Sequence, residues 1–295
     1  MTEIREKLKQ SARLTEECLT DFCYGNDTEL QRLFDSESYS LLGGGKRIRP
    51  FIVKEVCAAL GGDRKSAEYY GAAIEMVHTY SLIHDDLPCM DNDDMRRGKP
   101  TNHRVFGYST ALLAGDALLT KAFLAAASNP YCTEEQNAEA VRLIAVAAGD
   151  RGMIGGQVID LEGENKRLEL GQLLRLHRLK TGALIRCAAE LGALCAGYGR
   201  DSREYEEAVA YADGVGLAFQ VIDDILDATS TEEELGKTVG TDAARGKTTF
   251  LSYFDVNGAA DYAKELTDRA VSVIAHWQEP KTLCELAYYL LERKN

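Results

Sequence analysis

Apolar residues recur at steps of three and four along most of the chain, the spacing that places them on one face of an α-helix. No segment shows the sustained alternation of a strand, and the most strand-like run, 248–254, is isolated. Prolines occur only where the helical period starts or stops. The pattern predicts an all-α fold of ten or more helices, with approximate spans 2–23, 28–41, 48–60, 66–85, 108–127, 134–150, 169–197, 203–227, 259–276 and 281–292.

Composition is that of an ordinary globular protein: 295 residues, 45% of them hydrophobic, with a formal net charge of −13. No Pro-rich, Ser-rich or long charged tract marks a linker, so we expect one domain over 1–295. An acidic chain is a poor partner for nucleic acid, whose phosphates need a basic face. A polyphosphate ligand would have to be met by a local cluster of cations.

The eight cysteines form no CxxC pair and are too few for a disulfide framework in a chain of this length. We therefore expect reduced thiols. Residues 1–10 lack the apolar core of a signal peptide, and no uncharged stretch approaches the ~18 apolar residues of a membrane span. These features predict a cytoplasmic protein without a transmembrane segment.

The densest chemistry lies in residues 83–100, IHDDLPCMDNDDMRRGKP. Two carboxylates ~4 Å apart repel by roughly 4 kcal/mol at an effective dielectric of about 20, so such a cluster calls for cations. Mg²⁺ takes a few carboxylates together with substrate phosphates, and the adjacent arginines, Arg96 and Arg97, suit phosphate oxygens. A solvated acidic loop is the alternative, whereas the EF-hand calcium spacing is absent. The five carboxylates are Asp85, Asp86, Asp91, Asp93 and Asp94.

A basic motif precedes it, GGGKRIRP at 43–50. Its glycines allow close approach of the backbone to a ligand, and a phosphate at the start of the following helix gains N–H donors and the helix dipole. A flexible connector with a solvated basic tail is the alternative. His78 lies seven residues before Asp85, so the two share a helix face ~10 Å apart. His78 is therefore a candidate donor in the same cavity, or an ordinary core histidine.

Residues 219–227, FQVIDDILD, carry a second acidic motif on an apolar helix. Gln220, Asp223 or Asp224, and Asp227 follow helical spacing and form one polar stripe. Buried carboxylates there are costly without cations, although a solvated face is the alternative.

Three further cations are candidates for phosphate binding. The sequence Lys180-Thr181-Gly182 interrupts a long helical pattern and predicts a kink there, with a surface lysine as the alternative reading. Lys237 and Lys247 lie in a later loop. The Gly246-Lys247-Thr248 triplet is not a P-loop, because its glycine spacing is wrong and no strand precedes it.

Together these motifs resemble the trans-isoprenyl diphosphate synthase family, from about residue 30 to the last helix. The resemblance rests on 43–50, on DDLPCMD at 85–91 with the following RRGKPT, on 180–182 and on 219–227. It implies an all-α bundle around a deep apolar cavity, usually a homodimer. It also implies metal-dependent head-to-tail condensation of isopentenyl diphosphate with dimethylallyl or geranyl diphosphate.

The resemblance also implies roles for individual residues. Three Mg²⁺ ions, replaceable by Mn²⁺, would bridge the two acidic motifs and the allylic diphosphate, held by Asp85, Asp91 and Asp223 with support from Asp86, Asp224 and Asp227. The allylic diphosphate would be held by Arg96, Lys180, Thr181, Gln220 and Lys237. Lys247 is a further candidate substrate ligand because of its place in the loop, and not because of the resemblance. Isopentenyl diphosphate would be held without metal by Lys46, Arg49, His78 and Arg97.

Pro88 bears on the geometry of the first acidic motif. On an ideal helix Asp85 and Asp91 lie about 120° apart, but proline cannot continue the helix. We therefore expect residues 87–90 to bulge and return Asp91 beside Asp85. This two-residue insertion, Leu87-Pro88, resembles that of the bacterial farnesyl and plant-type geranylgeranyl synthases.

Tyr80, five residues before Asp85, lies at the position that bounds the product in the family. Ser81 shares the face of Asp85 and is small enough to let a tail pass. A large side chain at position 80 implies a C15 product, farnesyl diphosphate, with geranylgeranyl diphosphate as the alternative. A terpene cyclase or a non-catalytic synthase subunit also stays open, although the former normally carries a different second motif and the latter lacks intact acidic motifs.

Overall fold

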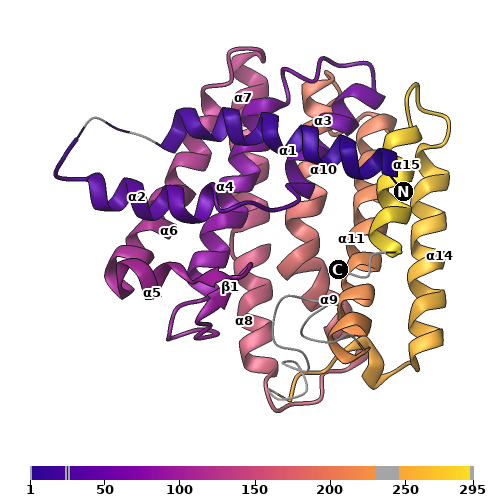
Figure 1. The fold of residues 1–295 in the computed structure, drawn as a ribbon. Helices are drawn as coiled ribbons and strands as arrows, with labels where there is room; N and C mark the ends of the chain where they lie inside the picture. Colours follow the sequence, from indigo (N-terminus) through magenta and orange to yellow (C-terminus); the bar gives the residue numbers. More distant parts are fainter. Residues whose placement is uncertain (1, 24, 26, 230–245, 293–295) are drawn as a thin grey trace.

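The computed structural model describes residues 2–23, 25, 27–229 and 246–292, and these form a bundle of α-helices (Figure 1). The all-α prediction is confirmed, with more than ten helices and one two-stranded hairpin in the described part. The elements are α1 (Thr2–Cys23), α2 (Gln31–Leu41), α3 (Ile48–Ala59), α4 (Glu68–Asp85), β1 (Met95–Arg96), β2 (Lys99–Pro100), α5 (Asn102–Phe106), α6 (Tyr108–Ala127), α7 (Glu134–Ala148), α8 (Met153–Gly163), α9 (Leu170–His177), η1 (Arg178–Gly182), α10 (Ala183–Cys195), α11 (Arg203–Thr229), η2 (Phe250–Ser252), α14 (Val256–Ile274) and α15 (Lys281–Leu291).

The sequence prediction differs from the structure in several places. It did not include the short helix α5 or the β1–β2 hairpin. Nor did it include α8, whose 11 residues contain three glycines and so have low helix propensity. It also treated 169–197 as one helix, whereas the structure divides this span into α9, a five-residue π-helix at Arg178–Gly182, and α10. The interruption of the α-helix predicted at Lys180-Thr181-Gly182 is therefore present, as a π-helical segment.

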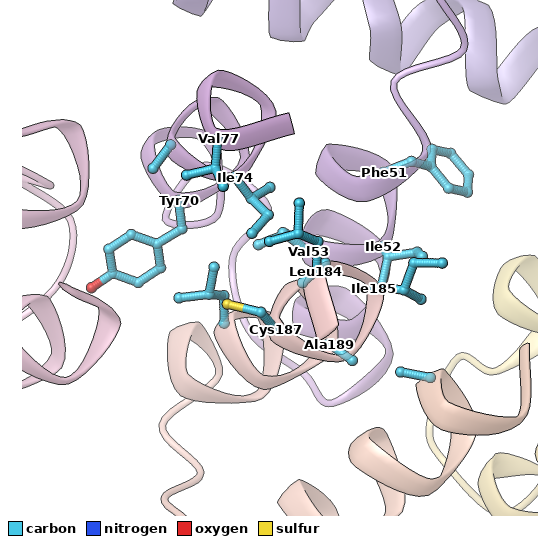
Figure 2. Close-up of a cluster of buried hydrophobic side chains, with 14 of the residues drawn as sticks. Phe51, Ile52, Val53, Tyr70, Ile74, Val77, Leu184, Ile185, Cys187 and Ala189 are labelled. Carbon is cyan, nitrogen blue, oxygen red and sulfur yellow. The ribbon is translucent and has the colours of Figure 1, made fainter. Parts of the chain in front are cut away.

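The larger core lies where α3, α4 and α10 meet (Figure 2). Phe51, Ile52 and Val53 from α3 and Ile74 from α4 are at most 1% exposed. Gly192 allows α10 to approach α3, because a Cβ atom there would lie 2.7 Å from the Val53 carbonyl oxygen. This packing fixes the two helices that carry the basic motif and the first acidic motif.

A second core joins α9, α11, η2 and α14. Val221 and Phe250 are fully buried in it, and α11 packs extensively against α14. The second acidic motif lies on this part of α11. Apolar packing therefore holds this helix, while its polar stripe lines a hollow shared with Asp160 of α8 and Lys180 of η1.

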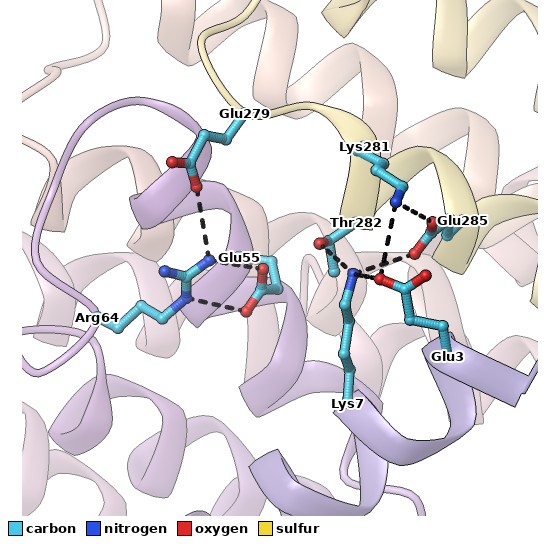
Figure 3. Close-up of polar contacts among 8 residues, drawn as sticks. All are labelled: Glu3, Lys7, Glu55, Arg64, Glu279, Lys281, Thr282 and Glu285. Carbon is cyan, nitrogen blue, oxygen red and sulfur yellow. Dashed lines mark hydrogen bonds and ion pairs between the residues drawn. The ribbon is translucent and has the colours of Figure 1, made fainter.

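The first and last described helices, α1 and α15, contact each other (Figure 1). Lys7 of α1 donates to Thr282 and Glu285 of α15, each at 3.2 Å, as Figure 3 shows. In the same view the Arg64 guanidinium donates two hydrogen bonds to the Glu55 carboxylate, each with a nitrogen–oxygen distance of 3.1 Å. These contacts are partly exposed, so each contributes little more than about 1 kcal/mol.

Helix α6 bears on the sequence expectation about membrane spans, although it carries two charged residues, Asp116 and Lys121. Among the described residues it is the one helix long and apolar enough, by length and composition alone, to cross a bilayer. It packs against α4, α2 and α7, as the inner helices of a helical bundle do. All eight cysteines have free thiols, as expected.

Candidate active site

The first acidic motif begins at the last turn of α4. The backbone N–H of Asp91 donates to the carbonyl oxygen of Asp85 at 2.8 Å, and those of Met90 and Asn92 donate to Leu87. An α-helix would pair Asp91 with residue 87, so two extra residues loop out and Asp91 returns beside Asp85. The bulge predicted from Pro88 is confirmed at the level of the backbone.

Burial and charge act together on Asp85. Burial first, and then the neighbouring Asp91, raise the pKa of the Asp85 carboxyl to about 6, although Lys180 opposes the shift. A carboxyl group in this state gains from any cation placed beside it.

Arg96 and Asp86 are partners in this structure. The Arg96 Nε atom donates to both oxygens of Asp86, at 2.8 and 2.9 Å, and the terminal nitrogen lies 2.6 Å from Oδ1. Asp86 is buried, and burial raises its pKa despite this arginine.

Arg96 lies on β1, and the turn to β2 consists of Arg97 and Gly98, both with positive φ. Such a turn is typical of two-residue hairpins, and it projects the arginines from a short rigid element.

The basic motif forms a separate cavity of about 550 Å³. Four of the residues that line it were predicted to hold one ligand: Lys46, Arg49, His78 and Arg97. Burial lowers the pKa of Arg49 to about 10, and burial together with the surrounding arginines holds that of His78 well below its usual value. His78 is therefore neutral near pH 7 inside a positive pocket, and the pocket suits an anion.

Local geometry keeps this pocket open. A Cβ atom at Gly45 would lie 2.8 Å from the Arg97 guanidinium, so glycine makes room for the arginine. Arg97 donates to the carbonyl oxygen of Gly44. Arg47, the remaining cation of the motif, also lines the pocket but is committed to protein partners: it is buried, adopts φ 50° and donates to Glu75 at 2.7 Å and to the Leu41 carbonyl at 2.6 Å. Arg47 therefore supports the loop.

The second acidic motif lines another hollow, of about 180 Å³. Gln220, Asp223, Asp224 and Asp227 of α11 share it with Lys180 of the π-helix. The Asp224 Oδ2 atom accepts the backbone N–H of Phe250 at 2.7 Å, so this buried aspartate also fixes η2. Thr181 follows Lys180 in the same π-helical segment, and π-helical turns are common at functional sites.

Asp160 of α8 is a site residue that the sequence analysis missed. Its Oδ2 atom accepts from Lys180 at 2.6 Å and from Lys247 at 2.7 Å, so one carboxylate holds two predicted phosphate ligands. Gly156 makes this possible, because a Cβ atom there would lie 2.2 Å from the Lys180 backbone nitrogen. The signal in the sequence was weak: one aspartate, four residues after a glycine pair, in a stretch with no strong helical pattern.

His177 is a second missed residue. Its Nδ1 atom lies 3.2 Å from Gln220 Oε1, its ring stacks on Phe250 with centroids 5.2 Å apart, and Nε2 lies 3.9 Å from Asp224. Burial lowers the pKa of His177 to about 4, so the ring is neutral at pH 7. It positions the Gln220 amide at the edge of the hollow.

Lys180 joins the two acidic motifs. Burial alone disfavours its charged form, but Asp160, Asp85 and Asp91 outweigh burial and raise its pKa. Lys180 therefore lies within electrostatic reach of Asp85 and Asp91 of the first motif, and it also lines the hollow of the second motif.

The carboxylates fit divalent cations that take oxygen ligands. Among the described residues no three acidic, cysteine or histidine side chains converge closely enough to hold a metal ion alone. Magnesium, however, is commonly held by one or two carboxylates together with ligand phosphates and waters. The donor set therefore fits a cation whose coordination a diphosphate completes. Lys237, another predicted ligand, lies outside the described residues.

Tyr80 and Ser81 occupy the α4 helix above Asp85. Tyr80 is 5% exposed, its ring contacts that of His84 edge to face, and its buried hydroxyl has no hydrogen-bond partner among the described residues. Burying a hydroxyl without a hydrogen-bond partner lowers the free energy of unfolding by about 1–3 kcal/mol. Stability therefore does not explain why a tyrosine stands at this position. The Ser81 hydroxyl donates to the His78 carbonyl at 2.8 Å.

Comparison with known proteins places the chain among characterised relatives. The polyprenyl synthetase family model matches residues 31–282. A farnesyl diphosphate synthase of Haemophilus influenzae is 39% identical over 100% of both chains. A putative chloroplastic geranylgeranyl pyrophosphate synthase of Arabidopsis thaliana is 44% identical over 85% of this chain and 71% of its own. The crystal structure of an FPP/GFPP synthase from Zymomonas mobilis superposes with a TM-score of 0.89 at 35% identity, over 98% of this chain and 99% of that one.

Proposed function

The chain belongs to the polyprenyl synthetase family and is a prenyltransferase, and from this premise we propose that it condenses isopentenyl diphosphate with dimethylallyl and then geranyl diphosphate to give farnesyl diphosphate. One observation carries the proposal more than any other. Lys180 lines the hollow of the second acidic motif and lies within electrostatic reach of the first, and a separate basic pocket is lined by no carboxylate except Glu75 among the described residues. This arrangement suits two diphosphates that are bound in different ways.

The allylic diphosphate is proposed to bind between the acidic motifs with Mg²⁺, three ions by resemblance to the family. Asp85, Asp91 and Asp223 would hold the metal, with support from Asp86, Asp224 and Asp227. Asp86 and Asp224 already bind Arg96 and the Phe250 N–H, which supports an indirect role for these two. Bound Mg²⁺ would stabilise the charge that develops on the leaving diphosphate.

The cations around this space would hold the same diphosphate. Lys180 and Lys247 are both bound to Asp160 without ligand, so an incoming phosphate must compete with one carboxylate for two lysines. Because a diphosphate carries more charge than a carboxylate, the exchange favours the ligand once metal is present. Arg96, Thr181, Gln220 and Lys237 complete the proposed set.

Isopentenyl diphosphate is proposed to occupy the pocket of Lys46, Arg49, His78 and Arg97 without metal. Three cations there meet one diphosphate, and neutral His78 can donate a further hydrogen bond. Phe219 of α11 also lines this pocket, directly before Gln220 at the other hollow. The two substrates would therefore approach each other along α11.

In the proposed reaction the allylic C–O bond breaks and its electron pair leaves with the diphosphate. The double bond of isopentenyl diphosphate then attacks the allylic carbon, and a proton is lost from the adduct. The departing diphosphate is the proposed base, so no side-chain base is assigned. Apolar walls around α4 keep water from the allylic cation.

Tyr80 is the proposed limit on product length. Its large buried ring lies on the helix that the growing tail must follow away from Asp85, and its hydroxyl has no partner among the described residues. Geranylgeranyl diphosphate is the second candidate product, because relatives named for that activity are 44% identical.

A homodimer is also proposed. Exposed apolar side chains continue along neighbouring helices α6, α7 and α8: Leu112, Leu113, Leu124, Val146, Ile154 and Val158. Apolar side chains gathered in this way are typical of an interface, and a second copy would cover them. A cytoplasmic location is part of the same proposal.

Product analysis tests the proposed function. Purified enzyme is incubated with Mg²⁺, labelled isopentenyl diphosphate and each allylic diphosphate in turn, and the dephosphorylated products are separated by chromatography. We expect C15 as the end product from dimethylallyl and geranyl diphosphate, and little extension of farnesyl diphosphate. Accumulation of C20 would replace the C15 proposal with the second candidate, and absence of any elongated product would contradict both.

A further inference from the structure

Three thiols meet far from the proposed active site, around Ser66. Cys57 lies on α3, Cys132 lies in the connection between α6 and α7, and Cys195 ends α10. The sulfur atoms of Cys132 and Cys195 lie 3.9 and 3.4 Å from one oxygen, the Ser66 carbonyl, so they can be separated by no more than the sum of these distances. The Cys57 sulfur lies 3.7 Å from the Ser66 hydroxyl. Residues distant in sequence thus bring three sulfurs to one point.

The three thiols are not equivalent. A hydrogen bond from Cys195 lowers the pKa of the Cys132 thiol to about 7, and Tyr70 contributes in the same direction. Burial raises the pKa of Cys195 well above its usual value. The hydrogen bond from Cys195 also lowers the pKa of Cys57, but Cys57 is fully buried, whereas Cys132 is half-buried beside exposed Pro130 and Tyr131. One thiol is therefore accessible and ionisable, and a second, protonated thiol lies next to it.

We propose that Cys132 and Cys195 form a reversible disulfide when the protein meets a peroxide. The Cys132 thiolate attacks one peroxide oxygen, the O–O bond breaks, and a sulfenic acid and hydroxide result. The hydroxide takes up the proton that the thiol released on ionisation and becomes water. The Cys195 sulfur then attacks the sulfenic sulfur and expels a second water. In total two thiols are oxidised and one hydrogen peroxide is reduced to two waters. A resolving thiol beside a low-pKa thiol is the arrangement that redox-sensitive cysteines use.

The local backbone can accommodate the bond. A disulfide needs the sulfur atoms about 2 Å apart, so one side chain must move. Cys132 lies in a connecting segment, and the Asn129 side chain that donates to its sulfur at 3.3 Å is its main polar restraint there besides Ser66. Cys195 is the last residue of α10, where a helix end gives way more easily than its middle.

The bond would form without contact with the reacting groups. Cys195 lies 13 residues after Gly182 of the π-helix, which is about 20 Å along a helix axis. Loss of either thiol should therefore leave condensation by the reduced enzyme unchanged within about twofold. The disulfide is detected by peptide mass and not by activity, so failure of the thiol proposal can be told apart from failure of the proposed function.

Peptide mapping after oxidation tests the proposal. The reduced full-length protein is treated with hydrogen peroxide, blocked with an alkylating agent and digested without reductant. We expect a linked peptide pair containing Cys132 and Cys195, lighter than the two free peptides by two hydrogen atoms and separated by dithiothreitol. Cys132 should lose its free thiol roughly tenfold faster than Cys284, whose pKa burial raises.

Variants separate the roles of the two thiols. Cys195→Ser should leave a sulfenic acid on Cys132 that dimedone traps, whereas Cys132→Ser should abolish both the linked pair and the trapped adduct. Cys89→Ser is the matched control, because Cys89 is exposed but takes its hydrogen bond from the Tyr108 hydroxyl, and the linked pair should persist. Absence of a linked pair, a pair containing Cys57 in place of Cys132, or loss of Cys132 no faster than Cys284 would overturn the proposal.

Discussion

Replacing Tyr80 by alanine should lengthen the product beyond C15. Tyr80 is 5% exposed and its ring packs edge to face on His84, with centroids 5.6 Å apart. The substitution removes the whole ring and hydroxyl from the α4 wall above Asp85. If the tail of the growing product extends along this helix, the space vacated by the ring admits a further isoprene unit.

The structure sets the size of the accompanying loss of stability. Truncation of a buried aromatic side chain typically lowers the free energy of unfolding by about 3–5 kcal/mol. The Tyr80 hydroxyl has no hydrogen-bond partner among the described residues, and its removal returns about 1–3 kcal/mol. The net loss should be roughly 2 kcal/mol, which lowers the melting temperature by several degrees and leaves the protein folded.

Chromatography of dephosphorylated products, with labelled isopentenyl diphosphate in excess, measures the change. Tyr80→Phe is the matched control: it keeps the ring, so it should retain C15, and it should match or exceed the native melting temperature. We expect Tyr80→Ala to yield C20 or longer products. A Tyr80→Ala enzyme that is folded, active and still stops at C15 would refute the reasoning, and so would a Tyr80→Phe enzyme that makes C20.

Two further predictions concern the diphosphates. Asp85→Ala and Asp223→Ala should each lower kcat by about 10²–10³ because a group that supports the developing anion is lost, and near-normal kcat with an unchanged circular dichroism spectrum would reject that residue's role. Arg49→Ala and His78→Ala should mainly raise KM for isopentenyl diphosphate, and Lys237→Ala mainly KM for the allylic substrate. KM values measured separately for the two substrates decide this, and the reverse pattern would reject the division.

The helical periodicity was sufficient to predict most of the bundle, and proline chemistry was sufficient for the bulge before Asp91. In both cases a local rule fixes the backbone: 3.6-residue spacing in α6, whose span 108–127 matches the structure, and the missing N–H of Pro88. A local rule also predicts the interruption of the helix at Lys180, because it follows from a Thr-Gly pair within an otherwise apolar helix.

Pairings between distant residues could not be read in the same way. Asp160 binds Lys180 and Lys247 only because Gly156 allows α8 to approach the π-helix, and nothing in the sequence around Asp160 marks that approach. Within the first acidic motif the sequence also did not show which carboxylate Arg96 pairs with, and in the structure it is Asp86. The tertiary packing determines which residues pair, whereas the local spacing is compatible with several partners.

The central claim is that this chain joins prenyl diphosphates with the help of divalent metal held by its two acidic motifs. Its most direct test is turnover of isopentenyl and geranyl diphosphate by enzyme stripped with a chelator, before and after addition of Mg²⁺. We predict no elongated product in excess chelator and restored condensation when Mg²⁺ or Mn²⁺ exceeds the chelator. Undiminished condensation in excess chelator would contradict the account.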